Sequence, residues 1–334
     1  MAKYLFVGEA DGNTGPSNVN KGIVSNLTDS FCVADSKNKI KKYLSAIVNT
    51  FRCKAVIVSG MSKVGLYAIK LAKCLNKKTI YIMHGCYEIE STLNEEVTDV
   101  NSVNMEPYVL HNVDLLLSVS KRYAERILKE YPCCNGKTTY LHNGVDKLKL
   151  DSGTVERKKG RIIAVGGDRK LKNNIAVANA MAKLDDKKKL MVYGYLYHPD
   201  DLPKGNNIEF KGLVSQEQLY KEMAQSELFV LNSTLESFGL TVFDALQCGC
   251  SVLISNAAGA LDLLDVAEHD VIYDPMDEDE IAKKIDYLLQ NPNNSRLMKD
   301  LNFDEISYKT EVKKLELLAS GEISHLMSGE TDQS

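Results

Sequence analysis

The feature that most constrains this 334-residue chain is a succession of short, wholly apolar runs separated by stretches with helical periodicity. Runs that are apolar throughout, rather than alternating, are typical of parallel strands buried on both faces. The alternation therefore predicts an α/β fold built on doubly wound sheets, with ligands at the carboxyl ends of the strands. In the first half of the chain these runs lie at residues 4–8, 31–35, 55–59, 79–83 and 115–119.

The same pattern restarts after a polar, charged stretch, Asp151–Gly160, which we interpret as a linker. Further strands are predicted at residues 161–166, 189–194, 208–212, 227–231 and 251–255, and helices at 174–184 and 277–290. The chain length suits two domains of about 150 residues each. We predict Rossmann-like domains over residues 1–150 and 151–303, facing a central cleft, and a C-terminal helix within 304–334 that packs back on the first domain and ends in a frayed tail.

Composition and charge narrow the class of protein. No run of about 18 apolar residues is present, and the N-terminus has no basic and apolar leader, so we expect a cytoplasmic protein. Eight cysteines occur without a paired C-x-x-C set, which favours reduced thiols over structural zinc. Residues 1–150 hold 20 Lys and Arg against 14 Asp and Glu, whereas the remainder holds 21 against 31. This asymmetry fits a first domain that faces an anionic partner, such as a lipid-linked phosphate or a membrane surface, or it is chance variation between domains.

A helix predicted over residues 38–51 leaves two alternatives open. Its apolar residues include Ile40, Leu44, Ile47 and Phe51 at helical spacing, accompanied by several lysines. Such a stripe either packs on the sheet or lies on anionic lipid at the inner face of the cell membrane.

The segment that carries the chemistry runs from Leu231 to Ser255. It reads as a strand, a loop, a helix beginning near Leu240 and a second strand. A helix N-terminus presents unpaired N–H groups and the positive end of the helix dipole, which suits a diphosphate. Gly239 allows close approach of the backbone, and the carboxylates of Glu236 and Asp244 can hold sugar and ribose hydroxyls.

The stretch from Glu236 to Asp244 resembles the E-x7-E signature of retaining GT-B glycosyltransferases of family 4. Other matches occur in the same order as in that family, over nearly the whole chain. They are Asp114–Ser120 (D-x-x-x-x-V-S), Asn143–Asp146 (N-G-V-D), Val165–Gly167 with Lys172 and Asn173, and Phe210–Val214 (F-x-G-x-V).

The resemblance implies a nucleotide-sugar site and assigns roles to particular residues. Glu236 would hold the transferred sugar, Asp244 the ribose, and Lys172, helped by Arg169, would neutralise the diphosphate in place of a metal ion. In the first domain Gly15 would approach the phosphates, and His84 would meet the sugar near the reacting centre; the alternative for His84 is a structural histidine bonded to backbone. Backbone N–H groups would contact sugar and phosphates around Phe238, Gly239, Leu240 and Thr241.

Two departures from the family pattern affect these roles. The last acid of the signature is Asp244 where the family has Glu, and Gly167 stands where the family usually has Arg. The sequence Asp277-Glu-Asp279 is interpreted as a helix start and not as a metal site.

We therefore expect a retaining glycosyltransferase that uses a UDP- or GDP-sugar without a metal, acting on a lipid-linked or surface-polysaccharide acceptor, with no nucleic-acid partner. Two other classes stay open. A non-catalytic accessory subunit with the same fold would account for the departures, whereas a two-domain oxidoreductase would need a dinucleotide fingerprint that the chain lacks.

Overall fold

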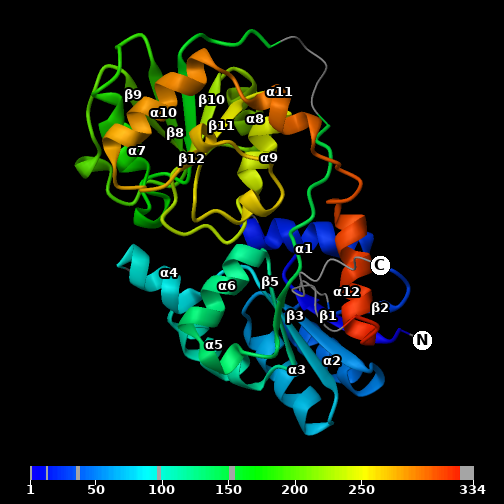
Figure 1. Ribbon diagram of the computed structural model, residues 1–334. Coiled ribbons are helices and arrows are strands. Elements are labelled where there is room, and N and C mark those ends of the chain that lie inside the picture. The colour runs from blue at the N-terminus through cyan, green and yellow to red at the C-terminus, as the bar shows by residue number, and fades with distance from the viewer. Residues whose placement is uncertain (1, 13, 35–37, 96–98, 150–154, 324–334) are drawn as a thin grey trace. The chain divides into compact units, whose positions relative to one another are not determined.

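A computed structural model describes residues 2–323 except 13, 35–37, 96–98 and 150–154. Residues 1–92, 97–146 and 303–334 group into one compact unit, and residues 93–96 and 147–302 group into a second. The ribbon in Figure 1 shows an α/β arrangement in each unit. The predicted boundary between residues 150 and 151 lies outside the described residues.

The first unit is built on a six-stranded sheet in the order β2-β1-β3-β4-β5-β6, in which every neighbouring pair is parallel. The strands are β1 (Tyr4–Gly8), β2 (Phe31–Val33), β3 (Ala55–Ser59), β4 (Lys78–Met83), β5 (Leu115–Ser118) and β6 (Thr138–Tyr140). The helices are α1 (Gly15–Asn26), α2 (Lys39–Arg52), α3 (Lys63–Cys74), α4 (Tyr87–Asn94), α5 (Val100–Asn112), α6 (Lys121–Glu130) and α12 (Tyr308–Ser320).

The second unit repeats the design with the order β12-β11-β10-β7-β8-β9, again parallel throughout. Its strands are β7 (Arg161–Val165), β8 (Lys189–Tyr193), β9 (Ile208–Gly212), β10 (Leu228–Leu231), β11 (Ser251–Ser255) and β12 (Val271–Ile272). Its helices are α7 (Asn174–Met181), α8 (Gln216–Ala224), α9 (Leu240–Gln247), α10 (Glu278–Gln290) and α11 (Asn294–Lys299).

The predicted strands are confirmed because their apolar runs form the two cores. All residues of β1, β3, β5, β10 and β11 are buried, as expected for parallel strands covered on both faces. In the second unit one face of the sheet packs on α7 and α10 through a cluster that includes Val177, Met181, Ile281 and Ile285. The short strands β6 and β12 were not predicted, because two or three residues carry too little periodicity to be recognised.

The last described helix, α12, packs against α1. The Thr28 hydroxyl donates a hydrogen bond to Glu316 over 3.0 Å, and the Lys78 ammonium donates to the Leu318 carbonyl over 2.7 Å. A Cβ at Gly22 would lie 2.5 Å from the Tyr308 ring, so the glycine makes room for this contact. The C-terminal helix is thereby part of the first unit.

Helix α2 does not bury its large apolar residues. Ile40 is 71% exposed, Leu44 56% and Phe51 58%, whereas the small residues Ala46 and Thr50 form the buried side of the helix. Of the two alternatives for this stripe, packing on the sheet is therefore wrong. Over the part of the chain that the structure describes, no helix is long and apolar enough to cross a membrane.

Candidate active site

The segment from Glu236 to Asp244 forms the loop and helix start that the sequence predicts. Strand β10 ends at Leu231, and α9 begins at Leu240 after Gly239, which has a φ of +97° at the N-cap position. A side chain is strained in that left-handed conformation, so glycine suits the turn. The side chains of Leu240 and Thr241 are half-buried in the first turn of α9. The backbone N–H groups at this end of α9 can therefore donate hydrogen bonds to an anionic ligand.

The buried side chain of Phe238 anchors the loop. It is 1% exposed and stacks on Phe243, with ring centroids 5.6 Å apart. The Phe238 carbonyl accepts a hydrogen bond from the Ala260 N–H over 2.5 Å, and the Glu236 carbonyl accepts one from Gly259 over 3.1 Å. Phe238 can therefore offer a ligand only its backbone, because its ring belongs to the core.

The two residues with the most direct predicted roles, Lys172 and Glu236, are in contact. The Lys172 ammonium forms an ion pair with the Glu236 carboxylate, and their side chains are only 16% and 13% exposed. The Ser233 hydroxyl adds a longer hydrogen bond to the same carboxylate, at 3.4 Å. Residues 64 positions apart thus form one partly buried, charge-compensated cluster next to the start of α9.

Glycines at the end of β7 position Lys172. The φ of Gly166 is +120°, and a Cβ there would lie 2.5 Å from Lys172 Cγ, so the aliphatic stem packs directly on the glycine backbone. The N–H groups of Gly166 and Gly167 both donate to the Tyr193 carbonyl, over 2.7 and 3.0 Å. The short 3-10 turn 170–172 is held by the N–H of Thr234, which donates to the Leu171 carbonyl over 2.9 Å. The end of β7 and the loop after β10 are therefore hydrogen-bonded to each other at the site.

The structure explains why glycine stands at position 167, where the family that this sequence resembles usually has arginine. Its φ is +63°, and a Cβ would lie 1.9 Å from the Tyr195 carbonyl oxygen, so no side chain fits. Arg169 lies two residues later, at the start of the 3-10 turn, and is half-buried. Its carbonyl accepts hydrogen bonds from the N–H groups of Lys172 and Asn173. No contact joins the Arg169 side chain to the Lys172–Glu236 pair among the described residues, so its role in binding stays a prediction.

Asp244 lies in α9 with a partly buried carboxyl group. Burial raises the pKa of this carboxyl to about 7. In the described part of the chain no group donates a hydrogen bond to it, although its charge helps to raise the pKa of Tyr220 and of Cys248, after burial as the main cause. Asp244 is thus a carboxyl group that lacks a donor in this structure, which is a property of a ligand-binding acid.

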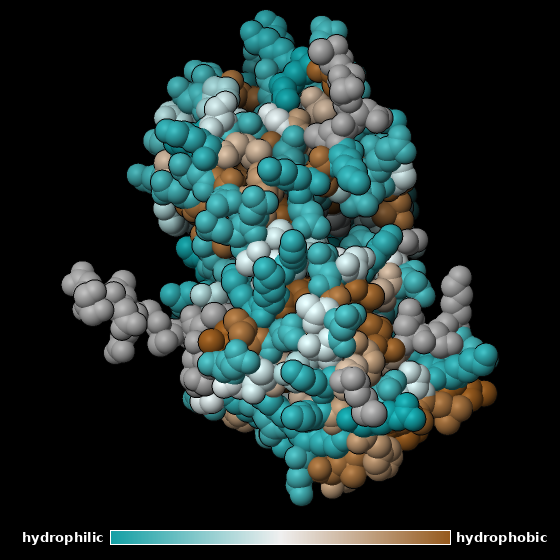
Figure 2. Space-filling view, turned by 90° about the vertical axis from the view of Figure 1, so that its right-hand side faces the viewer, coloured by the Kyte–Doolittle hydropathy of each residue, from teal (hydrophilic) through white to brown (hydrophobic). Residues whose placement is uncertain are grey.

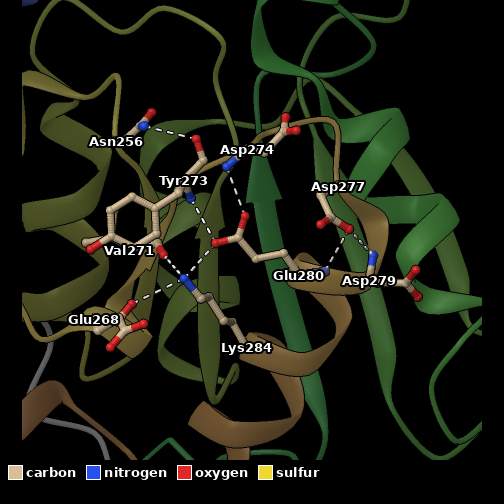
Figure 3. Close-up of polar contacts among 9 residues, drawn as sticks. All are labelled: Asn256, Glu268, Val271, Tyr273, Asp274, Asp277, Asp279, Glu280 and Lys284. Atoms are coloured by element: carbon tan, nitrogen blue, oxygen red, sulfur yellow. Dashed lines mark hydrogen bonds and ion pairs between the residues drawn. The ribbon is translucent and has the colours of Figure 1, made fainter.

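Hydrogen bonds and an ion pair hold the loop between β12 and α10, as Figure 3 shows. The Glu280 carboxylate accepts hydrogen bonds from the N–H groups of Tyr273 and Asp274 and pairs with Lys284. Asn173 and Asn232 donate their side-chain N–H groups to the Pro275 carbonyl of this loop, over 2.6 and 2.9 Å. The loop therefore fixes Asn173, the neighbour of Lys172.

The prediction that Asp277 to Asp279 start a helix is confirmed. Asp277 caps α10 and accepts hydrogen bonds from the N–H groups of Asp279 and Glu280. Asp279 pairs with Lys183 over 2.8 Å. The Asp277 carboxylate thus caps the helix, and the Asp279 carboxylate is used by an ion pair with the segment that follows α7.

In the first unit, His84 follows the last residue of β4 and is oriented by a chain of hydrogen bonds. Its Nε2 lies 2.8 Å from the Ser59 hydroxyl, which donates to Oδ1 of Asn20 over 2.5 Å. Asn20 in turn donates to the carbonyls of Glu9 and Ser59 over 3.1 and 3.4 Å, which assigns the orientation of its amide. Because the single hydroxyl proton of Ser59 is used by Asn20, Nε2 of His84 must carry its proton and donate to Ser59.

This arrangement leaves His84 neutral, with a buried acceptor that is unpaired among the described residues. Burial lowers the pKa of its imidazole to about 4, and Nδ1 is buried without a hydrogen-bond partner among the described residues. A neutral ring whose Nε2 is protonated has a lone pair on Nδ1 and can accept a hydrogen bond from a ligand hydroxyl. The ring bonds to a serine side chain and not to backbone, and the contact of His84 with a sugar stays a prediction.

Gly15 has no steric reason to be glycine within the protein. It is the first residue of α1, and a Cβ there would meet no atom within 4 Å. Gly12 is the confined one, since a Cβ would lie 2.5 Å from the Ser17 hydroxyl oxygen. Close approach of a ligand at Gly15 stays a prediction.

The sequence did not point to Asn20, Ser59 or Asn232 as parts of the site. Asn20 and Ser59 are 39 residues apart and belong to no recognised motif. The one available signal was the position of Ser59, at the carboxyl end of a predicted strand next to the strand that carries His84.

The fold and the site together define the class of protein. Two parallel six-stranded sheets with surrounding helices are the GT-B glycosyltransferase fold, and solved structures of that fold superimpose on this chain. Residues 147–302, which make up nearly all of the second unit, match the model of the family Glycosyl transferases group 1.

Solved structures of similar shape cover nearly the whole chain. HepE of Anabaena, determined with UDP and glucose, is 13% identical and superimposes with a TM-score of 0.70 over 96% of this chain and 100% of its own. WaaG, a glycosyltransferase involved in lipopolysaccharide biosynthesis, is 13% identical with a TM-score of 0.63 over 95% and 100%. At these identities the likeness establishes the fold.

Two curated proteins are related in sequence over part of their length. One is the Campylobacter jejuni N-acetylgalactosamine-N,N'-diacetylbacillosaminyl-diphospho-undecaprenol 4-alpha-N-acetylgalactosaminyltransferase, 27% identical over 187 residues, which are 53% of this chain and 51% of that protein. The other is the mannosylfructose-phosphate synthase of Agrobacterium fabrum, 22% identical over 41% of this chain and 31% of that protein. The matched region thus spans about half or less of each relative.

Proposed function

We propose that this chain is a retaining glycosyltransferase that moves a sugar from a nucleotide diphosphate to an acceptor hydroxyl. The observation that carries the proposal is the contact between Lys172 and Glu236 beside the N-terminus of α9. Lys172 and the N–H groups at the start of α9 suit the negative charge of the diphosphate, which is the leaving group. The Glu236 carboxylate suits the hydroxyls of the sugar. The HepE structure with UDP and glucose supports the same type of donor, and UDP or GDP is the proposed nucleotide.

Donor binding would rearrange the ion pair. The diphosphate competes with Glu236 for the Lys172 ammonium, which releases the carboxylate to accept hydrogen bonds from the sugar. Asp244, which lacks a donor in the described structure, would take the ribose hydroxyls. His84 would accept a hydrogen bond from a sugar hydroxyl at Nδ1.

The proposed reaction is a front-face substitution. The bond between the anomeric carbon and the diphosphate oxygen breaks, and the acceptor oxygen forms its bond to the same face of that carbon. The acceptor proton passes to the departing phosphate oxygen, so no enzyme nucleophile is needed. Lys172 and the N–H groups at the start of α9 stabilise the negative charge on the leaving diphosphate, in the role that a metal ion fills elsewhere.

A lipid-linked or surface-polysaccharide intermediate is the proposed acceptor. The name of the C. jejuni relative contains a diphospho-undecaprenol acceptor, and WaaG acts in lipopolysaccharide biosynthesis. The basic excess of residues 1–150 suits an acceptor with a phosphate group next to an anionic membrane surface. In that setting the protein would work from the cytoplasmic side of the membrane.

Hydrolysis of radiolabelled UDP-, GDP- and dTDP-sugars tests this function. We expect slow hydrolysis of one donor by the wild-type protein and its loss in Glu236→Ala. Glu217→Ala, an exposed carboxylate paired with Lys221 on α8, is the matched control and should hydrolyse the donor like the wild type. Nucleotide binding without turnover would instead identify a non-catalytic accessory subunit, and a fully active Glu236→Ala would refute the site.

A further inference from the structure

The apolar stripe of α2, formed by Ile40, Leu44, Ile47 and Phe51, is the largest unexplained feature of the first unit. These residues follow one another at spacings of four, three and four, which places them on one side of a helix. Their exposed fractions are 71%, 56%, 43% and 58%. Isolated exposed apolar residues are normal, but a continuous row about 16 Å long on one helix is not.

The stripe extends onto the neighbouring helix. Helix α3 packs beside α2, and its Tyr67, 57% exposed, lies with its ring centroid 6.0 Å from that of Tyr43. Val48, 43% exposed, widens the surface on α2 itself. Figure 2 shows apolar surface, in brown, gathered at the lower edge of the molecule beside hydrophilic surface in teal.

The charged residues of α2 and α3 are all basic. Residues 36–87 contain 11 Lys and Arg and no Asp or Glu. Lys41 and Arg52 are exposed at the two ends of α2, and neither has a carboxylate partner within the described residues. A surface of this composition is complementary to a partner that is both apolar and anionic.

We propose that the α2 stripe is a membrane-docking surface that lies in the interface of a bilayer containing anionic lipid. Apolar side chains on one face of a helix enter the boundary between headgroups and acyl chains, while flanking cations contact the anionic headgroups. This inference rests on the proposed function, because it names the surface by which the enzyme would reach a lipid-linked acceptor.

Vesicle sedimentation with the full chain tests the proposal without any nucleotide or acceptor. We expect binding to vesicles of equal parts phosphatidylglycerol and phosphatidylcholine, and much weaker binding to phosphatidylcholine alone. Leu44→Ser with Phe51→Ser should weaken binding at least about tenfold, since affinity scales with the apolar area inserted. Lys41→Gln with Arg52→Gln should weaken binding to the anionic vesicles about fivefold for each charge removed.

The matched control removes two exposed apolar residues from other places. Val100→Ser with Tyr287→Ser, at 60% and 41% exposure, should bind vesicles like the wild type. Equal binding of wild type and the α2 stripe variant, or no binding of wild type to anionic vesicles, would overturn the proposal. It would also be overturned if the stripe variant lost only a concentration-dependent dimer in light scattering, because the stripe would then join two copies of the chain. Calorimetry with UDP on the same preparations shows whether the donor site is intact, so failure of docking is distinguished from failure of the proposed function.

Discussion

At the scale of single residues, the account depends on the pair Lys172 and Glu236. Both side chains are largely withdrawn from water, so each depends on the other for compensation of its charge. Two well-packed apolar residues would contribute at least as much to the free energy of unfolding as this ion pair does. Its presence is therefore better explained by a ligand that exchanges with one of the partners.

A double-mutant cycle measures this coupling. Lys172→Met leaves Glu236 without its cation and should lower the free energy of unfolding of the second unit by about 1–3 kcal/mol. Lys172→Met with Glu236→Gln should recover most of that loss, because no unpaired charge remains. Urea unfolding followed by a probe in the second unit gives the values. A double variant no more stable than the single one would show that the two residues are not coupled.

A second prediction concerns the pH dependence caused by Asp244. Its pKa is raised from 3.8 to about 7, so between these values the folded protein binds more protons than the unfolded chain. The stability that protonation of this group contributes is therefore present at low pH and is lost as the pH rises through about 7. Asp244→Asn removes this loss, so its melting temperature relative to wild type should increase by at least about 2 °C between pH 5 and pH 8. A constant difference across that range would contradict the assignment.

The hydrogen-bond chain Asn20–Ser59–His84 leads to a third prediction. Ser59→Ala removes the acceptor of the His84 Nε2 proton, so the imidazole should populate the other tautomer and lose its available acceptor at Nδ1. Nitrogen chemical shifts of the His84 ring should show Nε2 protonated in the wild type and a mixture in the variant. We expect a lower kcat with little change in KM, and no change for Ser25→Ala on α1. A wild-type ring protonated at Nδ1 would refute this account.

At the scale of secondary-structure elements, the ends of β7 and β8 form the support of the site. The close approach of the two strand ends depends on glycines with positive φ, and it cannot be seen in a sequence before the register of the strands is known. The apolar runs predicted nearly every strand because parallel strands are buried on both faces, whereas β6 and β12 are too short to give a signal. The sequence left two alternatives open for the stripe of α2, because helical spacing shows that residues share a face but not whether that face is covered.

Gly167→Ala tests the strand ends. The Cβ would lie 1.9 Å from the Tyr195 carbonyl oxygen, so the turn must move and carry Lys172 with it. We expect a loss of about 2–3 kcal/mol in the stability of the second unit and weaker nucleotide binding. Gly212→Ala in the same unit is the control for stability, because its φ is also positive, at +71°, but its Cβ would meet no atom within 4 Å. Equal effects of the two substitutions would show that positive φ, and not the strand contact, explains Gly167.

At the scale of the whole molecule, the chain consists of two doubly wound units, and each carries its own group of candidate functional residues. The second unit carries the Lys172–Glu236 pair at the start of α9, and the first carries the hydrogen-bonded, neutral His84 and the exposed apolar stripe of α2. Motifs and apolar runs are local in the chain, so the sequence alone could assign each of them to the first or the second half of the chain. It could not predict the hydrogen bonds that fix His84 or Asn173, since those join residues that meet only after folding.

Calorimetric titration with UDP in the presence of EDTA tests the central claim most directly. The account predicts that the wild-type protein binds UDP without a metal, and that Lys172→Ala weakens binding at least about tenfold, the loss expected for a charge-assisted contact to phosphate. GDP takes the place of UDP in the same titration if UDP gives no heat. Absence of binding by both nucleotides, or equal affinity of wild type and Lys172→Ala, would contradict the assignment of the nucleotide-sugar site.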